Sequence, residues 1–186
     1  KGRVFVWAAG NGRQNGDNCN FDGYANSRYV IAVGALTDAG QQAPYSESCA
    51  ALLVVAPSRG GTRGITTTDL VGRNGYSADD YTSVFGGTSA AAPIVSGAVA
   101  LMLARNPNLT WRDVQHILRQ SSHRLDPGDP GWTAGPFPHN EKFGFGQLDA
   151  SAAADRAAAW TNVPPEVAVT PVTHTVNLSL PDSTTT

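Results

Sequence analysis

Phe85-Gly86-Gly87-Thr88-Ser89-Ala90-Ala91-Ala92-Pro93 is the stretch that decides the fold, and the apolar segment 94–106 comes directly after it. Gly86 and Gly87 can adopt backbone conformations that are closed to other residues. Pro93 is tolerated only in the first turn of a helix, so we expect a helix that begins near Ser89 and runs to 105. The helix is apolar nearly all round, which predicts that it is buried.

Ser89 would then lie at the positive, N-terminal end of a buried helix. A hydroxyl in that place suits a nucleophile whose attack creates an oxyanion. We therefore take Ser89 as a candidate nucleophile. The alternative is an ordinary serine that caps a core helix.

Composition sets the outer limits of the interpretation. The chain has 186 residues, 15% of them charged, with a net charge of −2. This length is enough for one domain with a real core, and the absence of a basic run argues against nucleic acid as a partner. We see no apolar run long enough to span a bilayer and expect no membrane segment. The chain begins inside a predicted strand without an initiator methionine, so we expect it to be a fragment with both ends missing.

Apolar runs predict strands at 3–9, 29–36, 52–56 and 65–68, with the first covered on both faces as in a parallel sheet. The polar segment 71–84 is predicted as a loop. Helices are expected at 89–105, from a Thr110 cap to about 120, and at 150–160. Strands that alternate with helices predict an α/β domain with a mostly parallel sheet, and its active groups should lie just after the strand ends.

The residue pattern of the sequence changes after residue 160. Pro164-Pro165 is typical of a linker, and residues 167–180 alternate like the strands of a β-rich domain. We therefore divide the chain into 1–160, an α/β domain, and 161–186, a linker with the beginning of a second domain.

Cys19 and Cys49 are the two cysteines, and each has an acidic residue two positions before it. Zinc needs more ligands at closer spacing, which leaves a disulfide or two unrelated buried thiols. A disulfide would bring Asp17 close to Glu47, and two neighbouring carboxylates suit calcium. The alternative is a set of separately solvated acids.

Asp22 would then be free to line a pocket and receive a cationic side chain. Asn11 comes after the first strand between two glycines and is a candidate hydrogen-bond donor to an oxyanion, or else part of an ordinary Asn-Gly turn. Serine chemistry also needs a base. The four histidines, at positions 116, 123, 139 and 174, carry no local signature of that role.

Five segments in order resemble the subtilisin-like serine proteases, and within them the kexin/furin branch of proprotein convertases. The segment 87–93 is similar to the nucleophile motif and 6–12 to the oxyanion segment. The segments 16–27, 45–49 and 108–115 are close to the kexin-type pattern. The resemblance covers roughly residues 1–160, and the residues after 160 are similar to the start of the P domain that accompanies such catalytic domains.

The resemblance implies a subtilisin-like three-layer fold, of which this chain is the C-terminal part, and a secreted serine endopeptidase that cleaves after arginine or lysine. It implies Ser89 as the nucleophile, with Asn11 and the Ser89 backbone N–H as the oxyanion hole. It further implies that Cys19 pairs with Cys49 and that Asp17 and Glu47 bind calcium.

The same resemblance places Asp22, Ala8 and Gly10 against the substrate, with Asp22 receiving the basic side chain. It implies an N-terminal propeptide and a P domain as partners. Its triad order of Asp, His and Ser places the base upstream of Lys1, so we expect the isolated chain to be inactive.

The segment 68–81 departs from furin and kexin, because it is longer and lacks an expected cysteine, as in bacterial members. Two other hypotheses therefore stay open: a subtilase of broader specificity, and a catalytically dead binding module.

Overall fold

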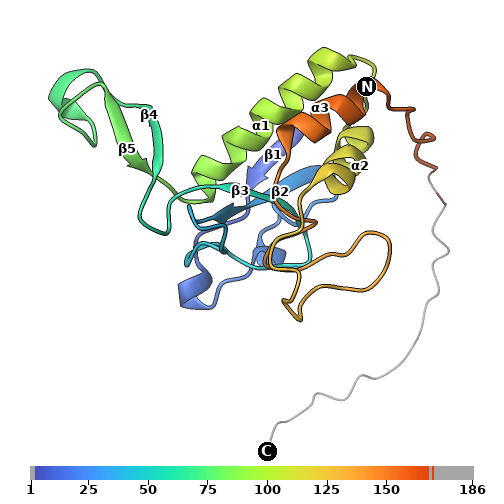
Figure 1. Cartoon of the computed structure of the whole chain (residues 1–186), viewed down its shortest axis with the longest axis horizontal. Helices are drawn as coiled ribbons and strands as arrows, with labels where there is room; N and C mark the ends of the chain where they lie inside the picture. The colour runs from blue at the N-terminus through green and yellow to red at the C-terminus, as the bar shows by residue number, and fades with distance from the viewer. Residues whose placement is uncertain (1–2, 168, 170–186) are drawn as a thin grey trace, which may run out of the picture.

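The computed structural model describes residues 3–167 and 169. Its centre is a parallel sheet in the order β1 (Phe5–Ala8), β2 (Val30–Leu36) and β3 (Leu52–Pro57) (Figure 1). Phe5 pairs with Val30, and Leu36 pairs with Pro57 at the other end of the sheet. The parallel strands predicted from the apolar runs are confirmed, with ends that shift by one or two residues.

Two helices, α1 (Thr88–Arg105) and α2 (Trp111–Ser121), pack on one face of this sheet, and a third, α3 (Ala150–Ala158), packs against both of them (Figure 1). The Thr110 hydroxyl accepts the Asp113 N–H and the Asp113 side chain accepts the Thr110 N–H, which confirms the predicted cap. Asp149 caps α3 by accepting the Ala152 N–H at 2.8 Å. α2 and α3 therefore each begin directly after a residue whose side chain caps the helix.

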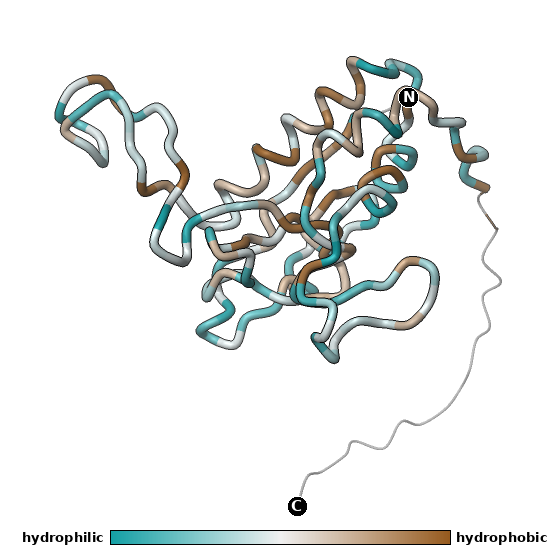
Figure 2. Tube along the Cα trace, viewed as in Figure 1, coloured by the Kyte–Doolittle hydropathy of each residue, from teal (hydrophilic) through white to brown (hydrophobic). Residues whose placement is uncertain are grey.

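The alternating side chains of β2 divide the core into two clusters. Ile31, Val33 and Ala35 face α1 and α2, while Ala32 and Leu36 face the loops around the two cysteines and Phe143. Those loops are mainly hydrophilic (Figure 2). The described residues thus supply the sheet and one helical layer of the predicted three-layer fold, with loops over the opposite face.

β1 differs from its prediction as a strand covered on both faces. Phe5 and Trp7 are exposed, whereas the residues between and after them are half-buried. Among the described strands β1 lies at the edge of its sheet, and an edge strand is covered less completely than a central one.

The prediction of a loop over 71–84 is partly wrong, because Tyr81–Phe85 forms β5. β5 pairs antiparallel with β4 (Ile65–Thr68), and this ribbon projects from the body of the molecule (Figure 1). Tyr, Thr, Val and Phe have high strand propensity, but the polar residues that precede them made the whole segment resemble a loop. Residues 69–80 connect the two strands and include the short 3₁₀ helix η3 (Gly72–Asn74).

α1 is not buried all round, which corrects the prediction from its apolar composition. Val95, Val99 and Met102 pack into the core, whereas Leu101 on the outer side is 55% exposed. Glycine and alanine residues on that side are exposed as well, and exposed apolar residues are common on protein surfaces. By length and composition α1 is apolar enough to cross a membrane, contrary to expectation, but its inner face packs against all three parallel strands.

Residues 161–167 contain neither helix nor strand, as a linker would. The strands predicted over 167–180 lie almost entirely outside the described residues, so the division at 160/161 stays a prediction. Residues 160–163 are nevertheless attached to α2. Asp113 accepts hydrogen bonds from the Trp160 indole at 2.9 Å and the Val163 N–H at 2.8 Å.

Candidate active site

Ser89 is the second residue of α1 and is exposed. Gly87, with φ at +78°, occupies the cap position and provides no side chain to the helix. Ser89 therefore does not cap α1, which removes the alternative interpretation of this serine. Its hydroxyl lies at the positive end of an 18-residue helix.

Asn11 reaches this helix end from the loop after β1. Its side-chain oxygen accepts the Thr88 N–H at 2.8 Å and the Thr88 hydroxyl at 3.0 Å. A backbone N–H can only donate, so the contacting atom is the amide oxygen and the Asn11 NH₂ group is left to face elsewhere. The Gly10 N–H also donates to the Thr88 hydroxyl, at 3.2 Å. Buried Thr88 thus attaches Gly10 and Asn11 to the start of α1, where the loop before Ser89 enters the helix.

Two further residues hold the same loop from the other side, and the sequence did not single them out. The Gly87 N–H donates to the Tyr45 hydroxyl at 3.0 Å, and the Ser58 hydroxyl donates to the Gly87 carbonyl at 2.7 Å. Tyr45 and Ser58 come after β2 and β3 and lie 42 and 29 positions from Gly87. No spacing rule connects residues so distant.

The backbone N–H groups around Ser89 have different partners. Those of Gly87 and Thr88 donate to Tyr45 and Asn11, and that of Ala90 donates to the Gly87 carbonyl at 3.0 Å. Within the described residues the Ser89 N–H donates to no protein acceptor, as expected for the first turn of a helix. It is therefore free to donate to a ligand.

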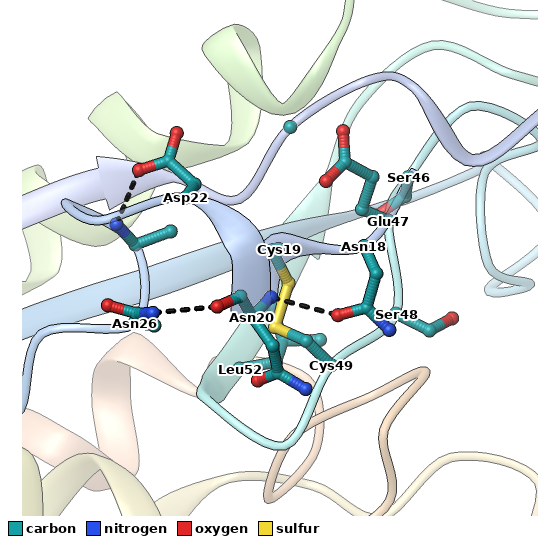
Figure 3. The surroundings of a disulfide bond; sticks show 12 residues. Asn18, Cys19, Asn20, Asp22, Asn26, Ser46, Glu47, Ser48, Cys49 and Leu52 are labelled. Carbon is teal, nitrogen blue, oxygen red and sulfur yellow. Dashed lines mark hydrogen bonds between the residues drawn. A yellow bond between two sulfur atoms is a disulfide. The ribbon is translucent and has the colours of Figure 1, made fainter. Parts of the chain in front are cut away.

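The disulfide predicted between Cys19 and Cys49 is present, with the two Cα atoms 5.5 Å apart (Figure 3). It joins the loop after β1 to the segment before β3, and both cysteines are buried. The bond confirms the pairing and rules out the alternative of unrelated thiols. Asp22 and Glu47 lie on either side of it in Figure 3.

The disulfide brings Asp17 and Glu47 towards the same glycine, Gly12. A Cβ atom on Gly12 would lie 2.6 Å from the Asp17 Cβ and 3.1 Å from the Glu47 Oε1. Glu47 is only 5% exposed, and its Oε1 accepts the Gly12 N–H at 2.8 Å. Within the described residues it forms no ion pair, and a buried carboxylate without a basic partner is costly unless a cation neutralises it.

These two carboxylates fit part of a calcium shell by their chemistry, because calcium prefers oxygen ligands. Calcium takes six to eight such ligands, however. Among residues 3–167 and 169 no third acid, histidine or cysteine joins the pair. The pair therefore offers a partial shell, and backbone carbonyls or water would have to complete it.

Asp22 is exposed, and one of its oxygens accepts the N–H groups of Tyr24 and Ala25 at 2.7 and 2.9 Å. The Tyr24 ring stacks on Trp7 with the ring centroids 4.9 Å apart. Trp7 immediately precedes Ala8, so the Asp22 segment lies beside the end of β1 that carries Ala8 and Gly10. A Cβ on Gly10, whose φ is +121°, would overlap the Glu47 carboxylate.

The described histidines have other partners. His116 lies 3.1 Å from the Arg119 guanidinium, and its pKa is lowered first by burial and then by Arg119. The His139 ring contacts the Leu52 carbonyl at 2.8 Å, and the backbone of His123 pairs with Gln147. None of the three hydrogen-bonds to Ser89 in this structure, and His174 lies outside the described residues.

The architecture and this site agree with the result of sequence comparison. Residues 1–146 match the model of the Subtilase family, and the chain belongs to that family.

The curated relatives narrow the resemblance to one branch. The chain is 46% identical over 168 residues to Protease KEX1 of Kluyveromyces lactis, covering 89% of this chain and 21% of that protein. It is 43% identical over 167 residues to proprotein convertase subtilisin/kexin type 7 of Homo sapiens, covering 88% and 21%. The chain therefore spans about a fifth of the length of these relatives.

Solved structures support the same fold. A serine protease of Aeromonas sobria superposes with a TM-score of 0.81 at 25% identity, covering 88% of this chain and 38% of that one. The same protease has been solved with a chaperone, and that chain aligns at 24% identity and a TM-score of 0.81. These comparisons confirm the α/β subtilisin-like architecture.

Proposed function

We propose that the protein containing this chain is a serine endopeptidase that cleaves protein substrates after arginine or lysine through an acyl-enzyme. The observation that carries the proposal is the pair of hydrogen bonds from Thr88 to the Asn11 oxygen. They hold the Asn11 amide next to Ser89, beside a helix end whose Ser89 N–H has no protein acceptor among the described residues.

In this mechanism the Ser89 hydroxyl oxygen attacks the carbonyl carbon of the scissile peptide. The Asn11 NH₂ group and the Ser89 N–H donate to the oxygen that becomes negative. The amine product leaves, and water then hydrolyses the ester on Ser89. The base that takes the serine proton is proposed to come from a part of the protein upstream of Lys1, so chain 1–186 alone is expected to be inactive.

Selection of a basic side chain is assigned to Asp22. One of its oxygens accepts two backbone N–H groups and the carboxylate is exposed, so the other oxygen is free to accept from an arginine or lysine. Ala8 and Gly10 would line the approach of the substrate to Ser89. The names of the relatives, which include kexins and proprotein convertases, favour this substrate class.

Asp17 and Glu47 are proposed to hold a calcium ion, which would supply the positive charge that their carboxylates lack among the described residues. A disulfide persists in oxidising compartments, which supports a secreted or secretory-pathway protein. A propeptide and a P domain are proposed as the partners within the full-length protein, and neither nucleic acid nor a membrane is proposed as a partner of this chain.

The proposal is tested on the full-length protein with peptide esters that end in arginine. We expect hydrolysis, covalent labelling by a serine-directed phosphonate, and loss of both in Ser89→Ala. Ser96→Ala is the matched control, because Ser96 is an exposed serine of the same helix and, within the described part of the chain, its hydroxyl bonds only to the Ala92 carbonyl. Equal activity of Ser89→Ala and Ser96→Ala would contradict the proposal.

Two alternatives give different results in the same assay. A subtilase of broader specificity would hydrolyse esters ending in leucine or phenylalanine as well as those ending in arginine, and Asp22→Asn would leave that ratio unchanged. A catalytically dead binding module would hydrolyse none of them and would not react with the phosphonate. For calcium, loss of thermal stability on chelation is expected in the wild type and not in Glu47→Gln.

A further inference from the structure

A pocket of about 520 Å³ opens beside the loop that precedes Ser89, and the proposed mechanism does not use it. Its walls come from the ends of three strands: Pro44 and Tyr45 after β2, Arg59 and Gly60 after β3, and Val84 and Gly87 around the end of β5. Gly87 is two residues before Ser89, so the pocket lies at the nucleophile rather than at a remote surface.

Arg59 is the charged group of this pocket. Its guanidinium donates to the Val84 carbonyl at 3.2 Å, and its own carbonyl accepts from the Tyr45 hydroxyl. A Cβ on Gly86 would lie 2.6 Å from the Arg59 Cβ, so the stem of the arginine packs against the serine loop. Among the described residues Arg59 forms no ion pair, and its side chain is exposed. The guanidinium therefore keeps donors free for an anion.

The hydrogen bonds around the serine loop place this pocket relative to Asp22. Thr88 is held by Asn11 and Gly10, which come after β1, and the Asp22 segment stacks on β1 through Tyr24 and Trp7. Gly87 is held by Tyr45 and Ser58, which come after β2 and β3. In the sheet order β1-β2-β3, Asp22 and Arg59 thus belong to opposite sides of the loop that carries Ser89.

We propose that this pocket receives the first residues after the scissile bond, and that Arg59 selects an acidic side chain there. The inference rests on the proposed function, because it places the substrate across Ser89 with its basic residue towards Asp22. The part of the peptide that leaves as the amine then runs towards Arg59.

The chemistry of the guanidinium favours this assignment. Its planar set of donors matches a carboxylate, and a lysine or arginine in the same place would meet a like charge. Because the site is open to solvent, the expected preference is modest, about two- to fivefold. Substrates with a basic residue before the cut and an acidic residue after it would match both sides of the site.

The test uses acyl transfer by the full-length protein. An arginine ester with an alcohol leaving group acylates the enzyme without placing any residue in the pocket. Added aspartic acid α-amide, alaninamide or lysinamide then competes with water for the acyl group, and the yield of each peptide product reports occupancy of the leaving-group side. Ester hydrolysis without added amine reports folding and the rest of the site.

The wild type is expected to transfer to the aspartic acid amide about two- to fivefold better than to lysinamide. Arg59→Gln should remove this preference and Arg59→Glu should reverse it, each measured as the ratio of the two peptide products formed by the same variant. Arg63→Glu is the matched control, because Arg63 is exposed in the same connection but does not line the pocket.

An active wild type without a charge preference overturns the inference, and so does an Arg59→Gln protein whose preference equals that of the wild type. If Arg59→Glu loses ester hydrolysis, the ratio of peptide products formed by Arg59→Gln decides the test. A wild type that does not hydrolyse the ester overturns the proposed function and this inference with it.

Discussion

Replacement of Asp113 is expected to lower the stability of the contact between α2 and the segment after α3. Its side chain is fully buried and accepts four hydrogen bonds. One oxygen accepts the Trp160 indole and the Val163 N–H, and the other accepts the N–H and the hydroxyl of Thr110. The carboxylate therefore joins the start of α2 to the segment after α3.

Asp113→Asn keeps the size of the side chain and replaces one acceptor by an NH₂ donor. If the amide points its NH₂ group at Trp160 and Val163, two half-buried N–H donors lose their acceptor. If it points the other way, the Thr110 N–H loses its acceptor. Hydrogen bonds to a charged group contribute about 1.5–3 kcal/mol, and each unpaired buried donor costs about 1–3 kcal/mol. The substitution is therefore expected to destabilise this joint by roughly 3–5 kcal/mol.

Hydrogen exchange of the Val163 amide in the full-length protein measures this joint directly. At about 1.4 kcal/mol per factor of ten, the expected loss of protection is at least a hundredfold. Asp155→Asn is the control, because the Asp155 side chain is 74% exposed and its contact with Arg105 is a long surface ion pair of 3.7 Å, which contributes little to stability. Protection at Val163 that differs less than fivefold between the two variants would refute the reasoning.

Three further predictions concern other contacts. Replacing both Cys19 and Cys49 by alanine should lower the free energy of unfolding by about 3.6 kcal/mol, because the bond spans 30 positions, and denaturant unfolding under oxidising conditions would measure it. The hydrogen bond from Lys142, with those from neighbouring groups, lowers the pKa of Asp129 to about 2. The stability from this carboxylate is therefore present above pH 4 and is lost as the pH falls towards 2, and Lys142→Met should flatten that loss in acid unfolding. Tyr45→Phe removes the hydroxyl that accepts the Gly87 N–H two residues before Ser89, so it should lower kcat about three- to tenfold with little change in KM. Tyr81→Phe is the control, because Tyr81 is an exposed tyrosine at the start of β5, and its kcat should equal that of the wild type.

Local patterns in the sequence were sufficient for the main elements and for part of the site. Apolar runs located the parallel strands, Thr110 located the start of α2, and the cysteine spacing allowed the disulfide that the structure contains. Each of these signals lies within a few residues or involves a pair with few alternatives. The same approach predicted the bounds of α1 but not its burial, because its alanines and Leu101 show helix-forming and apolar character without showing which face is covered.

Contacts between distant segments could not be predicted in this way. Tyr45 and Ser58 bind Gly87 across 42 and 29 positions, and the Asp113 carboxylate reaches Trp160 across 47. Such contacts depend on how the strand ends meet in three dimensions. A tyrosine or serine in a loop gives no periodic signal of its eventual partner, so these residues became visible only in the folded chain.

The cap position of α1 shows how the site and the fold constrain each other. The cap position of a helix is usually taken by serine, threonine, aspartate or asparagine, whose side chain accepts an N–H of the first turn. The cap residue of α1 is Gly87 instead, and no side chain within the helix or at its cap position caps it. Asn11 accepts the Thr88 N–H from outside the helix, which offsets part of the missing cap. A conventional cap at position 87 would reach the N–H groups of the first turn, including that of Ser89. Under the proposed mechanism this side chain would compete with the oxyanion for the same donor. Glycine at position 87 therefore leaves the helix less stable than a capping residue would, but it keeps the Ser89 N–H free for the substrate.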